Sequence, residues 1–192
     1  MIAVSKKDHS NNDCLLVTVM THGTNNGSIA AADKEYLLKE LWENFLGDNC
    51  ESLIGKPKLF FIDACRGDLT DPGVIFKPKQ DSLEKLKNGD EVDAQLTDQI
   101  FVIPKLADLL VMYGTVEGYQ SIYVPNNGSW FIQTLCKELR SNPNKDLMWI
   151  LTGVNRRLAY EKEANIENKP EKKQMPQIIS MLTKKLYFHP KA

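Results

Sequence analysis

Apolar residues of this chain gather in three short runs, at 14–20, 59–62 and 109–113. Each run is too short for a typical helix, and the first is rich in β-branched side chains, which favours buried strands. A further run at 178–188, from Ile178 to Phe188, also reads as a strand, although two lysines interrupt it. The pattern therefore predicts four strands.

Between these runs the apolar positions change to helical spacing. The spacing predicts a helix at 33–47, with Asp33 as its N-cap and Gly47 at its C-terminal end. Two more helices are predicted, one from about Ser129 and one from near Asp146. Strands that alternate with helices imply an α/β fold with a parallel sheet.

Composition narrows the class of protein but does not identify it. The chain has 192 residues, enough for one compact domain, with 42% apolar and 26% charged residues. Its net charge of −1 gives no electrostatic reason to expect nucleic acid or a membrane as a partner. No apolar run reaches the roughly 18 residues that span a bilayer. The four cysteines include no C-x-x-C pair, which predicts free thiols in a cytoplasmic protein and no metal site.

Two strands are followed by reactive side chains, His22 after the first and Cys65 after the second. The carboxyl ends of parallel strands share one edge of a sheet, so both side chains are expected to face one crevice. A thiolate attacks carbonyl groups and an imidazole transfers protons, and the N–H groups of Gly23 and Cys65 could bind an oxyanion. A cysteine or histidine after a strand is more often structural, so these residues alone leave both interpretations open.

The residues around Cys65 add a resemblance to a known family. Asp63-Ala64-Cys65-Arg66-Gly67 resembles the active-site pentapeptide of caspases, and Thr21-His22-Gly23 resembles their Ser-His-Gly. Segments 55–58, 128–133 and 180–183 resemble further caspase segments in the same order along the chain. The sequence is therefore identified as similar to the caspase family over nearly its whole length.

The resemblance implies a fold and an activity. The fold would be a caspase-like three-layer sandwich, an α/β arrangement with a mostly parallel central sheet, helices on both faces and an antiparallel edge strand. Cys65 would be the nucleophile of a cysteine endopeptidase, His22 its proton-transfer partner and Gly23 an oxyanion donor. Protein substrates and apoptosis-type proteolysis in the cytoplasm are implied, with no metal or organic cofactor.

The resemblance also implies an organisation into two subunits within one folded domain. Residues 1–93 would be a large-subunit part that lacks its first strands, with a linker from about 68, and 94–192 the small-subunit part. The strand at 178–188 would form a homodimer or a heterodimer. Missing first strands would expose an apolar edge beside 14–20, so we expect low solubility or marginal stability.

The first specificity pocket departs from the family pattern. Caspases select aspartate with two arginines and a glutamine, but Asp63 stands where the glutamine is expected and Tyr123 where one arginine is expected. The predicted substrate-binding residues are Asp63, Ser121, Tyr123 and Trp130. Three interpretations stay open: an ordinary aspartate-specific protease, a protease with an altered pocket, or a catalytically weak homologue that regulates an active caspase by dimerisation.

Two expectations follow from these features. The tetrapeptide ending at Asp93 resembles the site that executioner caspases cut, which predicts processing after Asp93 by an upstream or executioner caspase. The carboxylate of Asp63 predicts a preference for a basic residue over aspartate at the cleavage position, because an acidic pocket selects basic side chains.

Overall fold

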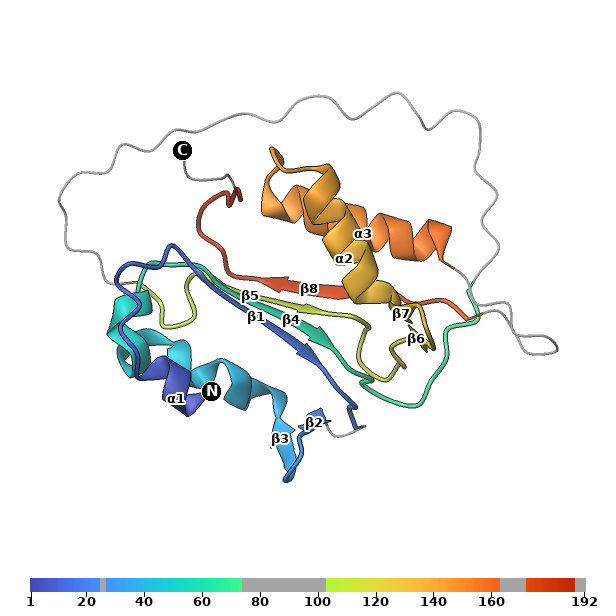
Figure 1. Ribbon diagram of the computed structural model, residues 1–192, viewed down its shortest axis with the longest axis horizontal. Coiled ribbons are helices and arrows are strands. Elements are labelled where there is room, and N and C mark those ends of the chain that lie inside the picture. The colour runs from blue at the N-terminus through green and yellow to red at the C-terminus, as the bar shows by residue number, and fades with distance from the viewer. Residues whose placement is uncertain (25–26, 74–102, 163–171, 189–192) are drawn as a thin grey trace.

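Four strands form the central sheet of this computed structural model, which describes residues 1–24, 27–73, 103–162 and 172–188. The strand order is β1-β4-β5-β8 (Figure 1). The bounds are Leu15–Met20 for β1, Lys58–Asp63 for β4, Leu109–Tyr113 for β5 and Gln177–Ser180 for β8. The first three are parallel and β8 is antiparallel, so the predicted α/β class and the antiparallel strand are confirmed.

The two central strands are buried along their whole length because layers cover both faces of the sheet. Alternate side chains of β4 enter different clusters. Phe60 and Ile62 face one side, whereas Leu59 and Phe61 face the other. This explains why the runs are continuously apolar rather than alternating.

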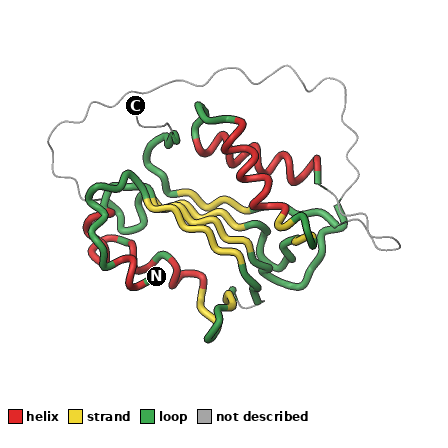
Figure 2. Tube along the Cα trace, in the orientation of Figure 1, coloured by secondary structure: helices red, strands yellow, loops and turns green. Residues whose placement is uncertain are grey.

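Two long helices cover one face (Figure 2). Helix α2 spans Trp130–Ser141 and α3 spans Leu147–Glu161. The side chains of Ser129 and Asp146 accept hydrogen bonds from backbone N–H groups in the first turns, so both predicted starts are confirmed. A short hairpin, β6 at Tyr123–Val124 and β7 at Gly128–Ser129, leads into α2.

The other face is covered by short elements (Figure 1). They are helix α1, the β2–β3 hairpin and three 3₁₀ helices. Their bounds are Ile2–Ser5 (α1), Ser28–Ala30 (β2), Glu35–Leu37 (β3), Leu38–Leu41 (η1), Glu43–Phe45 (η2) and Gly47–Leu53 (η3).

The predicted single helix at 33–47 is therefore wrong. Asp33 does not cap a helix, because its carboxylate accepts from the Tyr36 hydroxyl. Leu37 is extended, and the Glu40 side chain accepts from its backbone N–H, so helical turns begin only at Leu38. Gly47 has a φ of 49° and starts η3 rather than ending a helix. Apolar residues three and four apart also suit successive 3₁₀ turns that pack on a sheet.

The predicted strand at 178–188 is wrong in length, since β8 ends at Ser180. The Asp108 carboxylate accepts from the Thr183 backbone and hydroxyl and turns the chain out of the sheet. The Leu186 N–H then donates to Asp146 at the start of α3. Tertiary anchors thus end the strand where the sequence pattern continues. None of the described helices is long and apolar enough to cross a membrane.

Candidate active site

The ends of β1 and β4 lie side by side. Met20 is paired in register with Asp63, and the Thr21 N–H donates to the Asp63 carbonyl at 3.0 Å. His22 and Cys65 each follow two residues after this pair. Both line one cavity of about 450 Å³, whose other lining residues are Met20, Thr21, Asp63, Ala64, Ser121 and Tyr123. The structure thus brings the predicted pair into one cavity.

The loop of His22 packs its backbone directly against that of Cys65. A Cβ atom added to Gly23 would lie 1.8 Å from the Cys65 carbonyl oxygen, so only glycine fits this approach. The His22 carbonyl accepts from the Ala30 N–H of β2 at 2.8 Å. The β2–β3 hairpin thereby holds the His22 loop in place.

The loop that carries Cys65 is held from the other side by residues 118–121. The Arg66 N–H donates to the Tyr119 carbonyl at 2.9 Å, and a Cβ on Gly67 would lie 2.1 Å from the Gly118 oxygen. The Cys65 thiol lies 3.8 Å from the Ser121 carbonyl oxygen, to which it donates. The close backbone packing fixes where the thiol enters the cavity.

Arg66 directly follows Cys65 and belongs to the pentapeptide that resembles caspases, but it was not predicted as a site residue. Its guanidinium lies 4.1 Å from the centroid of the Tyr113 ring and donates to the Gln177 side chain and the Thr115 carbonyl. It also lies 3.7 Å from the Glu117 carboxylate. Burial raises the pKa of Tyr113, and the charge of Arg66 opposes that rise. Arg66 thus connects the Cys65 loop to edge strand β8.

Asp63 is 8% exposed and belongs to a chain of hydrogen bonds. The Ser121 hydroxyl donates to Asp63 Oδ1 at 2.5 Å. Gln174 Nε2 donates to the Ser121 hydroxyl at 3.2 Å and to the Gly114 carbonyl at 2.7 Å, while its Oε1 accepts from the Ile122 N–H. No sequence signal pointed to Gln174, because it follows a charged loop and reaches the site only through the fold.

The remaining predicted site residues have different positions. Tyr123 lines the cavity and is 66% exposed. Trp130 is 6% exposed within the cluster beneath α2 and α3 and is not among the cavity-lining residues, so its role as a substrate contact stays a prediction. Asp93 lies outside the described residues.

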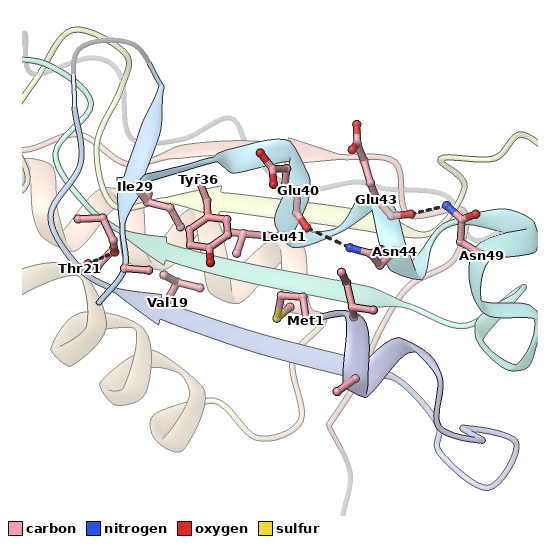
Figure 3. A pocket seen from close by; sticks show the side chains of 14 residues that line it. Met1, Val19, Thr21, Ile29, Tyr36, Glu40, Leu41, Glu43, Asn44 and Asn49 are labelled. Carbon is pink, nitrogen blue, oxygen red and sulfur yellow. Dashed lines mark hydrogen bonds between the residues drawn. The ribbon is translucent and has the colours of Figure 1, made fainter. Parts of the chain in front are cut away.

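A second cavity, of about 790 Å³, lies between β1 and the 3₁₀ helices (Figure 3). Apolar side chains such as Val19, Ile29 and Leu41 line it, together with Tyr36 and a few polar groups. It is larger than the cavity at Cys65, but neither a cysteine nor a histidine lines it. Of these two cavities, the smaller one thus holds the predicted pair of His22 and Cys65.

A family model described as the caspase domain matches residues 1–187. The chain belongs to the caspase family. Caspase-1 of Drosophila melanogaster is 42% identical over 94% of this chain and 54% of its own length. Caspase-3 of Mesocricetus auratus is 44% identical over 96% of this chain and 62% of its own length.

The crystal structure of Caspase-1 from Spodoptera frugiperda superposes with a TM-score of 0.82 at 39% identity. The match covers 97% of this chain and 67% of that one. The chain thus spans between about half and two thirds of the curated caspases named above.

Proposed function

We propose that this caspase-family chain is a cysteine-type endopeptidase that acts on protein substrates. The observation that carries the proposal is the placement of His22 and Cys65 in one cavity at adjacent strand ends, with Gly23 packed on the Cys65 carbonyl. Membership in the caspase family agrees with the same chemistry.

In the proposed mechanism His22 takes the proton of the Cys65 thiol, and the resulting thiolate adds to the carbonyl carbon of the scissile peptide. The resulting oxyanion accepts from the N–H groups of Gly23 and Cys65. Neither N–H donates in the hydrogen bonds of the described residues, so both are available. His22 then gives a proton to the leaving amine and later takes one from the water that hydrolyses the thioester, which restores the thiolate and imidazolium pair.

The finer biological role follows from the resemblance to caspases and is proposed with it. The chain would act in apoptosis-type proteolysis in the cytoplasm, as a zymogen that is cut after Asp93. Strand β8 lies at the edge of the described sheet, with Ile179 39% exposed, and it offers a surface for a homodimer or heterodimer. The alternative of a catalytically weak partner that regulates an active caspase rests on this same edge and on the unusual Asp63.

Labelling of the cysteines tests the catalytic proposal. We expect the 192-residue chain to hydrolyse members of a peptide library with all residues at the cleavage position, and to form an adduct at Cys65 with a peptidyl electrophile. Cys65→Ala should lose both properties, whereas the matched Cys136→Ala should keep them, because the half-buried Cys136 lies on α2.

Hydrolysis that survives Cys65→Ala would contradict the mechanism. No hydrolysis and no adduct by the wild type, together with an altered activity of an added active caspase, would favour the regulatory alternative.

Processing has its own test. Incubation with an executioner caspase is expected to give fragments 1–93 and 94–192 by mass spectrometry, and Asp93→Ala should prevent the cut. Because the Asp63 pocket is a poor match for aspartate, we expect no cut from the chain's own activity. Cleavage that Asp93→Ala leaves unchanged would remove the proposed processing site.

A further inference from the structure

Asp63 gives the cavity beside Cys65 a buried acidic group. Asp63 is 8% exposed and lies two positions before Cys65, the proposed nucleophile. Neither a lysine nor an arginine lines the cavity, and no ion pair among the described residues involves Asp63. The nearest cation in sequence, Arg66, is already bound to Gln177, the Tyr113 ring and Glu117. In the part of the chain that the structure describes, this carboxylate therefore has no lysine or arginine as a partner.

Backbone groups determine the orientation of the Gln174 amide. The Ile122 N–H requires an acceptor, which is Oε1, and the Gly114 carbonyl requires a donor, which is Nε2. Nε2 must then also donate to the Ser121 hydroxyl oxygen.

This orientation decides where the hydroxyl hydrogen of Ser121 points. A serine hydroxyl has one hydrogen, and its oxygen here already accepts from Gln174. The hydrogen is therefore directed to Asp63 Oδ1, 2.5 Å away, so this carboxylate oxygen accepts the bond. No hydrogen bond of the described residues uses Asp63 Oδ2, so that oxygen is left for a ligand.

We propose that this cavity binds the side chain of a lysine or arginine at the residue before the scissile bond, with Asp63 as its ligand and Gln174 as a positioning residue that acts through Ser121. The proposal rests on the endopeptidase function above. A cavity of about 450 Å³ accommodates an extended basic side chain. An aspartate side chain would bring a second carboxylate beside Asp63, and like charges repel. Tyr123, which lines the cavity and is largely exposed, has no cationic group that could compensate this repulsion.

Binding measured on the full-length Cys65→Ala chain separates recognition from chemistry. The probes are three peptides that differ only at the cleavage position, which is arginine, its neutral isostere citrulline, or aspartate. We expect arginine to bind about ten- to a hundredfold tighter than citrulline, as for a charged hydrogen bond, and aspartate to bind weakest. Equal affinity for arginine and citrulline, or tighter binding of aspartate, would overturn the proposal.

Two variants in the same background identify the residues responsible. Asp63→Asn should bring the arginine-to-citrulline ratio close to one. Gln174→Glu keeps an acceptor for Ile122 but cannot donate to Ser121, so it should lower the ratio while affecting citrulline less than arginine. If Gln174 had only a structural role, Gln174→Glu would instead weaken the binding of the arginine and citrulline peptides equally. A high ratio that survives Asp63→Asn would refute the assignment of Asp63.

The outcomes also separate this proposal from the proposed function. Hydrolysis of the peptide library with aspartate or neutral residues preferred would leave the endopeptidase standing and remove the basic pocket. Selective arginine binding without any hydrolysis or Cys65 adduct by the wild type would support the basic pocket and contradict the endopeptidase function.

Discussion

The two faces of the sheet are covered in different ways. On one face, two capped helices pack over a cluster whose central members, such as Phe131, Leu151 and Val154, are fully buried. On the other face, a hairpin and short 3₁₀ helices pack over β1 and β4 and leave a cavity of about 790 Å³ (Figure 3). The helical face is covered by two long helices that carry their own N-caps. The 3₁₀ face is covered by short elements, which we expect to be held in place mainly by packing on the sheet.

The two faces also supply different parts of the candidate active site. The β2 strand on the 3₁₀ side holds the His22 carbonyl. The hairpin that leads into α2 on the helical side begins just after Ser121, whose hydroxyl contacts Asp63. His22 and Cys65 therefore line a cavity that lies where the two layers reach the same edge of the sheet. Loosening either face should disturb a different half of the site.

The largest expected effects come from neighbouring leucines of β5 that face opposite sides. Leu110 faces the helices and Leu109 faces the 3₁₀ elements, and both are buried. Leucine-to-alanine changes in cores cost about 2–5 kcal/mol, with lower values where the surroundings can collapse. We expect Leu110→Ala to fall in the upper part of that range and Leu109→Ala in the lower part.

Denaturant unfolding of both variants against the wild type measures this difference in the free energy of unfolding. The two substitutions are identical and adjacent, so they control for the residue removed and for its place in the strand. A larger loss for Leu109→Ala would mean that the 3₁₀ face is the more rigid one.

The same difference between the faces explains what the sequence could predict. The buried strands β4 and β5 and the starts of α2 and α3 were predicted because their signals are local: apolar runs, and Ser129 and Asp146 as caps. The 3₁₀ helices within 33–53 were not predicted, because Leu37 is held extended in a hairpin by its pairing with Ser28. In the site, His22 and Cys65 were predicted from their places after strands, and Asp63 was predicted from the resemblance to the caspase pentapeptide. Gln174 was not, because its partners lie more than 50 residues away.

A smaller effect is expected from two aspartates at predicted helix starts, Asp33 and Asp146. Asp146 accepts from Met148 and Trp149 at the start of α3 and from the Leu186 N–H. Removing a helix cap costs about 0.5–2 kcal/mol, so Asp146→Ala should destabilise by about 1–2 kcal/mol. Asp33→Ala, at an exposed position that caps no helix, should stay within about 0.5 kcal/mol.

Thermal or denaturant unfolding checks this pair, and Asp146→Asn serves as the conservative variant that retains an acceptor. Equal losses for Asp33→Ala and Asp146→Ala would contradict the view that only the helical face depends on local caps.

The smallest expected effect is a pH dependence from Tyr113, whose side chain is buried on the 3₁₀ face. Burial raises its pKa above the ordinary value of 10.0; Arg66 opposes the rise and Glu117 adds to it. In the unfolded chain this tyrosine loses its proton first as the pH rises past about 10, while the folded chain keeps it. The unfolded state then binds fewer protons, so the free energy of unfolding falls with rising pH.

Tyr113→Phe should make that alkaline decline shallower. The matched Tyr160→Phe changes an exposed tyrosine of α3 on the helical side and should alter the slope less. Denaturant unfolding at several pH values between about 9 and 11 measures both slopes. Equal changes in the two variants would show that burial of Tyr113 makes no special contribution.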